Sequence, residues 1–501
     1  METKNASDRL KDLFSEAFVK NDPETLSKYS SSISGTALEP QCIVYPSSIS
    51  EVQRLVAASP ELGITLYPIS RGKNLGYGEA QGTGPGQVIV DLSNMNRIIQ
   101  VDAKMSTATI EPGVSQQQMY EFLRDNYPAL QIDVTGAGLD ASITGNILER
   151  GFGHTDYGDR WARVINMKIV TPDGALLQTG MGSLENADAQ NVYRYGIGPT
   201  IDGLFTQSGM GIIVEITMEL MPVPECVEMF VFSTRDENDA GRLTEVIRNL
   251  KLNGVVNSAV HIANRSRAIG EKTNRFAGAW NLSGVITGTP GMVRAKRRAV
   301  KKEFRNHIRS YKLHFLGKRS MSLVKWIHEH VKPVPVYDAL RDAFNLITGI
   351  PTDHPLKTLL NDDDLTSEHI DTRHYETCFS WINAICQCNE ESLNKLLHVI
   401  SSEFSEHGYE FRVTFTAVNP RTLIMISNIS YPRNEQEIQK AQKFLAGCQK
   451  KLTDNGFYPY RSGSGIHEKT PRHAASYLEF LKRIKATIDP NGIIAPGKYN
   501  L

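Results

Sequence analysis

The sequence predicts an α+β protein built as two lobes, and three observations favour this fold class. Strand patterns and helix patterns alternate through the first part of the chain. From about residue 225 the character changes, since strand-like runs such as MFVFST are mixed with charged helices. The last residues return to glycine-rich motifs. We therefore expect one lobe over 1–222, with a helical lead-in over 1–35, a second α+β lobe over 223–455, and a C-terminal segment over 456–501.

The elements of the first lobe follow from their apolar patterns and turn signals. Ser50 is expected to cap the helix after the first strand, and Ser115 to cap the helix that begins SQQQMYEF. A Pro-Asp-Gly turn at 172–174 predicts a hairpin. Strands are expected over 42–46, 64–70, 87–93 and 211–222, hairpins over 97–113 and 164–180, and helices over 47–59 and 115–126.

Composition and charge exclude several classes of protein. The chain has 55 basic and 55 acidic side chains, so it lacks the basic excess of a nucleic-acid binder. The basic run over 294–305 alternates with apolar residues, which is typical of the solvated face of a helix. The N-terminus has no apolar segment of signal-peptide length, and no stretch suits a membrane span. We expect a cytoplasmic protein without nucleic-acid or membrane partners.

The cysteines and the standard catalytic motifs give mainly negative results. Six irregularly spaced cysteines argue against a disulfide framework, and Cys386 and Cys388 form only a C-x-C pair, so no metal site is expected. Gly72, Gly76 and Gly78 follow a strand but do not have the G-x-G-x-x-G spacing. The chain has no Walker-type phosphate loop, no H-E-x-x-H and no G-x-S-x-G.

Two glycine-rich segments predict a binding site. In the loop over 70–78, glycines allow backbone N–H groups to point inward as an anion-binding concavity. Taken alone, this loop would serve equally well as a tight turn between strands. The stretch over 135–158 is rich in glycine and has no clear periodicity. So long a connection inside a compact domain is usually functional.

Seven segments carry a family resemblance in their order along the chain. They are PISRGKNLGYG, VIVDLSNMNRI, EPGVSQQQMY, GNILERGFGHTDYGDRW, DGALLQTGMG, GPTIDGLFTQSGMGIIVEI and IDPNGIIAPGK. Together they closely resemble the vanillyl-alcohol oxidase and 4-cresol dehydrogenase family of FAD-linked oxidoreductases. The resemblance is dense over 65–222, resumes over 455–501 and is weak between. It implies a two-lobed FAD-binding fold, in which 456–501 returns to the FAD-binding lobe and 223–455 forms an α+β cap over the substrate.

The resemblance also implies which residues bind FAD. The first loop would cradle the pyrophosphate, the glycine-rich stretch would run along the diphosphate and the flavin, and the strand near 212 would line the adenine and ribose. The implied residues are Ser70, Arg71, Gly72, Lys73, Asn74, Leu75, Gly76, Gly78, Gly138, Ser142, Gly145, Asn146, Gly151, Gly153, Tyr157, Gly158, Gly209, Gly211, Ile212, Val214 and Lys498.

A catalytic role is implied for Tyr77, Tyr460 and Arg461, which match the positions where phenol-oxidising members place a Tyr, Tyr, Arg cluster around the substrate hydroxyl. A free phenol has a pKa of about 10, and lowering it to about 7 requires roughly 4 kcal/mol of phenolate stabilisation. A guanidinium and two phenol hydroxyls in a dry site supply interactions of this kind. Without the resemblance, the tyrosines would be read as packing residues and Arg461 as a surface residue.

The sequence departs from the family at three places. Ala137 stands where the family oxidase has an Asp that aids water addition, with Asp133 and Asp140 on either side. His154 replaces a family Tyr and is a candidate base or stabiliser of reduced flavin.

The third departure concerns covalent attachment of the cofactor. The segment that attaches FAD in relatives reads DTRHYETC, and the alignment lands on Glu376, with Tyr375 the best candidate and His374 the other. Residues 1–150 contain no histidine, which removes the attachment in the first loop. We expect dissociable FAD.

The sequence leaves the substrate and the electron acceptor open. The leading expectation is oxidation of a para-substituted phenol, with oxygen or an acceptor protein reoxidising the flavin. A second reading keeps the fold but assigns a hydroxy acid, a sugar or a natural-product alcohol as substrate. A third is a non-catalytic binding protein on a flavin-type scaffold. The resemblance further implies a homodimer.

Overall fold

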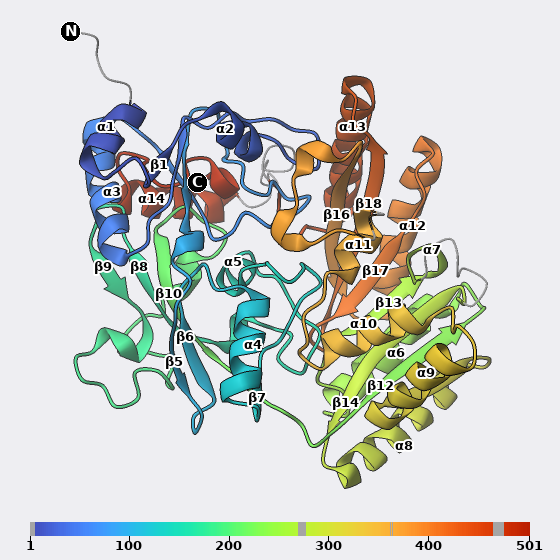
Figure 1. The fold of residues 1–501 in the computed structure, drawn as a ribbon. Helices are drawn as coiled ribbons and strands as arrows, with labels where there is room; N and C mark the ends of the chain where they lie inside the picture. The colour runs from blue at the N-terminus through green and yellow to red at the C-terminus, as the bar shows by residue number, and fades with distance from the viewer. Residues whose placement is uncertain (1–5, 269–276, 361, 363, 464–474) are drawn as a thin grey trace.

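A computed structural model describes residues 6–268, 277–360, 362, 364–463 and 475–501. Within these ranges the chain forms four β-sheets surrounded by helices (Figure 1). The α-helices are α1 Ala6–Leu13, α2 Pro23–Ser30, α3 Ile49–Leu62, α4 Gln116–Asn126, α5 Ile143–Leu148, α6 Asp239–Leu252, α7 Arg265–Ala268, α8 Pro290–His307, α9 Lys318–His330, α10 Tyr337–Ile347, α11 His354–Leu360, α12 Glu390–His407, α13 Glu435–Asp454 and α14 Ala475–Ile488.

The first sheet has the order β1-β2-β4-β3, and its strands β2, β4 and β3 are parallel. The apolar runs of these strands are buried, as is usual for parallel strands covered on both faces. The prediction that Ser50 caps the next helix is wrong. Ser48 lies in an extended conformation before α3, and its hydroxyl accepts the N–H of Glu51. The bounds are β1 Val19–Lys20, β2 Cys42–Val44, β3 Leu66–Ile69 and β4 Val88–Asp91.

The second sheet is antiparallel, with the order β5-β6-β10-β8-β9. Both predicted hairpins are present in it, and the second turns at residues 171–175. Ser115 caps α4, as predicted. A small pair, β7 and β11, lies beside it. The bounds are β5 Ile98–Asp102, β6 Thr107–Ile110, β7 Leu130–Gln131, β8 Val164–Val170, β9 Leu176–Gln178, β10 Ile212–Glu219 and β11 Met221–Pro222.

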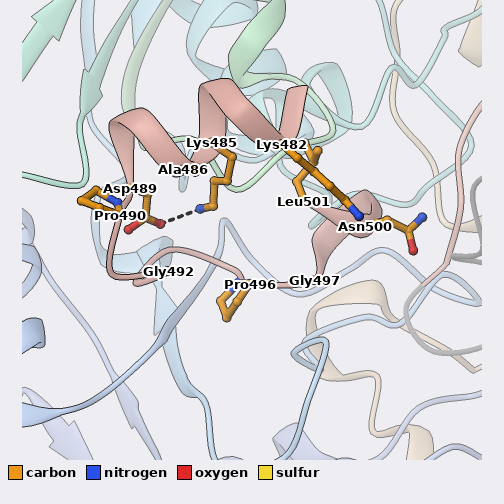
Figure 2. Close-up of a pocket in the computed structure, with 10 residues that line it drawn as sticks. All are labelled: Lys482, Lys485, Ala486, Asp489, Pro490, Gly492, Pro496, Gly497, Asn500 and Leu501. Atoms are coloured by element: carbon orange, nitrogen blue, oxygen red, sulfur yellow. Dashed lines mark hydrogen bonds and ion pairs between the residues drawn. The ribbon is translucent and has the colours of Figure 1, made fainter. Parts of the chain in front are cut away.

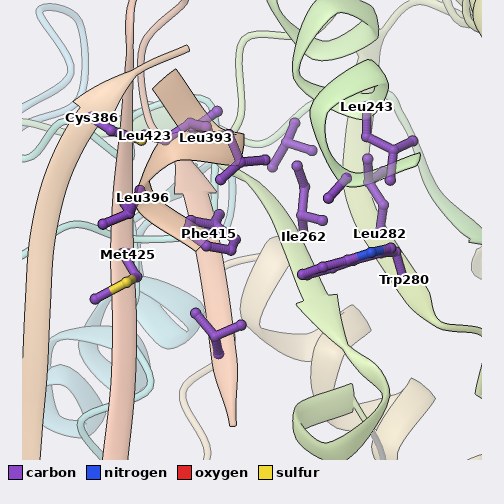
Figure 3. Close-up of a cluster of buried hydrophobic side chains, with 14 of the residues drawn as sticks. Leu243, Ile262, Trp280, Leu282, Cys386, Leu393, Leu396, Phe415, Leu423 and Met425 are labelled. Atoms are coloured by element: carbon purple, nitrogen blue, oxygen red, sulfur yellow. The ribbon is translucent and has the colours of Figure 1, made fainter. Parts of the chain in front are cut away.

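The largest sheet has seven antiparallel strands in the order β15-β12-β14-β13-β17-β18-β16. One face packs against α6, α8, α12 and α13 through a continuous apolar core (Figure 3). Leu243 of α6 and Leu396 of α12 meet Ile262 and Phe415 of the sheet there. The bounds are β12 Cys226–Thr234, β13 Val260–Asn264, β14 Trp280–Gly288, β15 Lys312–Gly317, β16 Thr377–Gln387, β17 Val413–Ala417 and β18 Thr422–Pro432.

The other face of this sheet carries an apolar cluster beside α9 and α10, and polar and aromatic side chains on β13, β16 and β18. Side chains alternate along a strand, so Phe379, Trp381 and Asn383 share one face of β16. Trp381 donates from its indole N–H to the carbonyl of Leu75 at 2.8 Å. This contact places the first glycine loop directly against β16.

The C-terminal residues pack on the first sheet. Leu66 of β3 donates to the carbonyl of Ile493 at 2.8 Å, and Ala495 donates back to Leu66 at 2.7 Å. Helix α14 accordingly lies on the side of the molecule formed by the N-terminal half (Figure 1). The last residues therefore reach the same region as the two glycine-rich segments. No helix in the described part of the chain is long and apolar enough to cross a bilayer.

Candidate active site

Tyr77 and the adjacent pair Tyr460 and Arg461, which are far apart in sequence, meet where the first glycine loop contacts β16. The guanidinium carbon of Arg461 lies 3.9 Å from the ring centroid of Tyr77 and 5.3 Å from that of Tyr460. Tyr77 sits in a tight turn, where its N–H donates to the carbonyl of Asn74 at 3.0 Å. Gly76 has a φ of +74°, a conformation that a residue with a side chain rarely adopts. The turn thereby fixes the direction of the Tyr77 ring toward Arg461.

The cluster favours an added anion. Burial raises the pKa of Tyr460 well above its ordinary value, although the charge of Arg461 opposes this. Burial disfavours the Arg461 guanidinium, but Tyr460, Tyr77 and Glu149 together raise its pKa, so it stays charged. The Nε of Arg461 is buried and has no hydrogen-bond partner among the described residues. A buried donor of this kind is costly unless a ligand accepts from it.

Asn383 holds the cluster together, and sequence reasoning missed it. Its side-chain N–H₂ donates to the carbonyl of Arg461 at 3.1 Å and lies 3.4 Å from the hydroxyl of Tyr77. Its side-chain oxygen accepts the backbone N–H of Tyr460 at 3.0 Å. The signal that sequence offers is the polar residue in the run FSWINAIC, at a position where alternation predicts an inward side chain. Only its neighbours in space reveal what it contacts.

A second charged group lies beside Arg461. The Nζ of Lys498 lies 2.8 Å from a carboxylate oxygen of Glu149, and the hydroxyl of Tyr499 donates to the other oxygen at 2.8 Å. Burial alone would raise the pKa of Glu149, but Lys498, Tyr499 and Arg461 outweigh it and lower that pKa. The side chain of Lys498 therefore neutralises Glu149 close to the cluster.

The cationic side chains of the first loop are both paired with Asp140. The guanidinium of Arg71 bonds the Asp140 carboxylate and also donates to its backbone carbonyl at 3.0 Å. The Nζ of Lys73 lies 3.3 Å from the same carboxylate. Burial lowers the pKa of Lys73, and Asp140 partly restores it. Asp140 is thus committed to two cations rather than positioned alone as a base.

The glycine-rich stretch contains a short helix that its composition did not predict. Ser142 caps α5, since its hydroxyl accepts the N–H of Gly145 at 2.9 Å and donates to the carbonyl of Pro112 at 2.6 Å. A Cβ on Gly145 would lie 3.1 Å from the hydroxyl of Ser70, so the two glycine segments run side by side. The Thr144 hydroxyl is buried there and has no partner among the described residues.

The turn that contains Gly151 and Gly153 is built over a buried carboxylate. Asp133 accepts from the N–H and the hydroxyl of Thr155, at 2.9 and 2.6 Å, and lies 3.6 Å from Arg160. A Cβ on Gly153 would overlap Asp133, at 1.5 Å from its Oδ2. Arg160 also donates to the side-chain oxygen of Asn146 at 2.7 Å. Asp133 therefore serves the turn through Oδ1, whereas its buried Oδ2 has no hydrogen-bond partner among the described residues.

His154 makes a hydrogen bond that crosses to the seven-stranded sheet. Its Nδ1 lies 2.9 Å from the Nε2 of His261 on β13, and the Nδ1 of His261 lies 3.0 Å from the Thr416 hydroxyl. Burial lowers the pKa of both histidines, although Asp133 opposes the shift at His154. Both rings are therefore neutral at neutral pH. His261 is a second residue that sequence reasoning missed, because it lies 107 positions from His154.

The two histidines predict a pH dependence of stability. A histidine in an unfolded chain titrates near pH 6.5, and the folded values lie below it, so the unfolded state binds more protons as the pH falls. Their contribution to stability is complete above about pH 6.5 and is lost as the pH falls below it. We expect the thermal midpoint to fall more steeply between pH 6.5 and 5 in the native chain than in the double variant His154→Phe, His261→Phe. Equal slopes would contradict this.

The remaining predicted residues lie away from the cluster around Arg461. The hydroxyl of Tyr375 donates to Asp362 at 3.1 Å, and burial raises its pKa to about 12. The side chains of His374 and Glu376 are exposed. Other predicted positions pack against protein. An added Cβ would meet Leu356 at Gly138, Ile169 at Gly211, the carbonyl of Gly153 at Gly158 and the carbonyl of Ile494 at Gly209. Ile212 and Val214 are buried in the apolar core, and the ring of Tyr157 lies under the guanidinium of Arg163.

A surface pocket of about 520 Å³ lies elsewhere, beside α14 and the C-terminal residues (Figure 2). Its Lys485 is fully engaged, since the Nζ pairs with Asp489 at 2.5 Å and donates to the carbonyls of Gly209 and Ile494. None of the residues that line it belongs to the cluster around Arg461. This pocket is a product of how the C-terminus is anchored.

Comparisons with known proteins match this arrangement. Residues 40–180 match a model described as an FAD binding domain. The chain is 28% identical over 490 residues to 1'-carboxy-chondrochloren decarboxylase of Chondromyces crocatus, covering 91% of this chain and 90% of that protein. It is 25% identical over 494 residues to the flavoprotein subunit of 4-cresol dehydrogenase [hydroxylating] of Pseudomonas putida, covering 94% and 89%. These matches support the resemblance of the chain to the vanillyl-alcohol oxidase and 4-cresol dehydrogenase family of FAD-linked oxidoreductases.

The structure of a 4-ethylphenol oxidase from Gulosibacter chungangensis, in complex with isoeugenol, has the same fold. The TM-score is 0.88 at 23% identity, and the match covers 99% of this chain and 96% of that one. The two-lobed fold expected from the sequence is therefore confirmed. The matched FAD binding domain and the flavoprotein relative indicate that FAD is the cofactor.

The residues present fit FAD. Positive φ values at Gly72, Gly76 and Gly78 bend the first loop in the way that glycine-rich anion-binding loops require, although the N–H groups of Gly76 and Tyr77 are bonded within the loop. The partnerless hydroxyl of Thr144 lies next to Gly145, where the second glycine segment passes Ser70. A group with many hydrogen-bond acceptors satisfies such donors. These two segments are the part of the chain that would hold the cofactor.

Proposed function

We propose that this protein oxidises a para-substituted phenol at the carbon bonded to the ring. The observation that carries the proposal is the cluster of Arg461, Tyr77 and Tyr460, in which the buried Nε of Arg461 lacks a partner among the described residues. Bound FAD accepts a hydride on its ring system. The role of the protein's own side chains is to make loss of that hydride from the substrate easier.

The cluster does so by stabilising a phenolate. Roughly 4 kcal/mol is needed to bring a phenol pKa from about 10 to about 7. A charge-assisted hydrogen bond contributes about 1.5–3 kcal/mol, so Arg461 with two phenol donors reaches this value. Asn383 fixes the backbone of Tyr460 and Arg461, which limits the reorganisation required when the substrate enters. Loss of the phenolic proton and of a hydride leaves a quinone methide.

His154 is the proposed base for the next step. Its ring is kept neutral by burial, and its Nδ1 is engaged by His261, which leaves Nε2 to take a proton. When water adds to the quinone methide, the water gives its proton to His154. Alternatively, the second carbon of the substrate's side chain gives a proton to His154, and the product is an alkene. His261 and Thr416 fix the tautomer and the orientation of the His154 ring.

The proposal extends to the cofactor's attachment and to its partners. The hydroxyl of Tyr375 is held by Asp362, and its raised pKa makes it a poor nucleophile, which favours dissociable FAD. We further propose reoxidation by oxygen or by an electron-acceptor protein, and a homodimeric assembly. Acid precipitation of the purified protein is expected to leave the yellow colour in the supernatant. Colour retained in the pellet would indicate covalent attachment.

An anaerobic absorbance scan tests the substrate class. Addition of 4-ethylphenol or 4-propylphenol is expected to bleach the flavin, because each has a free phenol and a hydrogen on the carbon bonded to the ring. The matched control is 4-ethylanisole, in which methylation of the oxygen prevents a phenolate from forming and bleaching is not expected. Bleaching by a hydroxy acid or sugar but by no phenol would favour the second reading of the sequence. Equal bleaching by the phenol and the anisole would remove the phenolate step.

A further inference from the structure

A second arginine lies on the same face of the seven-stranded sheet as Asn383, and the proposed chemistry does not use it. Arg267 belongs to α7, directly after β13, and the residue is partly buried. Its Nη1 donates to the side-chain oxygen of Asn428 on β18 at 2.8 Å. Its guanidinium carbon lies 5.8 Å from the ring centroid of Trp381 on β16. Arg267 therefore reaches across two strands of the sheet.

This arginine has no counter-ion in the part of the chain that the structure describes. No Asp or Glu there lies within ion-pair distance of its guanidinium, and the charge that acts on it is a second cation, Arg412. Arg412 has its own partner, since it lies 2.6 Å from Glu410. Burial, and to a smaller extent the charge of Arg412, lower the pKa of Arg267 to about 10, so it is still charged at neutral pH. Placing a charge in protein without a partner is unfavourable, and an anionic ligand removes that cost.

The position of Arg267 relates it to the phenol cluster. Asn428 pairs with Trp381 in the β16–β18 ladder, so the two side chains share a face of the sheet with Asn383. Trp381 and Asn383 are two residues apart, about 7 Å along the strand. The Trp381 ring is stacked 6.2 Å from the ring of Tyr77. Arg267 and Tyr77 therefore both lie next to the Trp381 ring, which places Arg267 one aromatic ring away from the phenol cluster.

We propose that Arg267 and Asn428 form an anion subsite that binds a carboxylate carried by the phenolic substrate. This inference rests on the proposed function, because it assumes that a phenol occupies the cluster around Arg461. A guanidinium presents parallel N–H groups that match the two oxygens of a carboxylate. The side-chain oxygen of Asn428 accepts from Nη1 and so holds one edge of the Arg267 guanidinium in place. A monoanion matches the single unpaired charge. The substrate class is then a phenol with an acidic side chain.

Equilibrium binding to the FAD-loaded protein tests this subsite without turnover. The probes are 4-hydroxybenzoate and 4-hydroxycinnamate, each paired with its amide, 4-hydroxybenzamide and 4-hydroxycinnamamide. None has an sp³ carbon next to the ring, so none is oxidised during calorimetry. For at least one of the two side-chain lengths, the acid should bind about 10- to 100-fold more tightly than the amide, as expected for a charge-assisted pair. In Arg267→Met and Arg267→Gln the ratio should fall to near one.

Arg265 supplies the matched control, because it lies on the same helix and is exposed. Arg265→Met should keep the preference for the acid. A native protein that binds acid and amide equally at both lengths, or binds neither, overturns the subsite, and so does a preference that survives in both Arg267 variants. Failure of the proposed function has a different signature, since 4-ethylphenol would then fail to bleach the flavin whatever the ratio of acid to amide.

Discussion

Replacement of Arg461 with alanine is expected to lower kcat/KM for 4-alkylphenols by about a thousandfold while FAD remains bound. The guanidinium is the charged member of the cluster, and its Nε has no other partner among the described residues. Loss of about 4 kcal/mol of phenolate stabilisation corresponds to roughly a factor of 10³ in rate. The measurement is steady-state kinetics together with the flavin absorbance of the purified variant.

Two further variants separate charge from packing. Arg461→Met keeps much of the side-chain volume against Tyr77 and should be as inactive as the alanine variant. Arg461→Lys keeps the charge and should recover part of the activity. Glu149 retains Lys498 and Tyr499 in all three variants, so no unpaired carboxylate is created. Unchanged turnover in Arg461→Ala, with FAD bound, would remove the phenolate assignment.

Replacement of Gly76 with alanine is expected to weaken FAD binding at least about tenfold and to lower the thermal midpoint. The residue has a φ of +74°, which costs an L-residue about 1–2 kcal/mol. A Cβ would also lie 2.5 Å from a ring carbon of Phe379 and 2.7 Å from the Trp381 indole. Relief of this overlap requires the loop to leave β16, and overpacking of this kind costs about 1–3 kcal/mol. Since 1.4 kcal/mol is a factor of ten, FAD titration will detect the change.

Gly63 provides the matched control for the conformational cost of a positive φ. It has a φ of +64° at the end of α3, and nothing lies within 4 Å of the position that its Cβ would take. Gly63→Ala therefore has the conformational cost without the overlap and should leave FAD affinity unchanged. If both variants lost FAD to the same extent, the contact of Gly76 with β16 would not explain the effect.

The sequence alone was sufficient to indicate the family resemblance, the cofactor and much of the local structure. Seven glycine-rich or strand segments in a fixed order are specific because several of their glycines meet a local demand, such as the positive φ of Gly72, Gly76 and Gly78. Hairpins and the Ser115 cap were predictable for the same reason, since their signals lie within a few residues. The cap of α3 was misplaced by two positions because Ser48 and Ser50 both satisfy the local rule. The helix α5 was missed because six residues show little periodicity.

The partners of the side chains were decided only by the tertiary structure. Asn383 bonds Arg461 and Tyr460 across 78 and 77 positions, and His261 meets His154 across 107. Such contacts depend on which strands of the seven-stranded sheet become neighbours and on which face each residue occupies. The apolar pattern of one strand contains no information about the polar group that will lie opposite it. Local signals therefore determine the scaffold, whereas the charge balance at Asp140, Arg267 and Arg461 is a property of the folded chain.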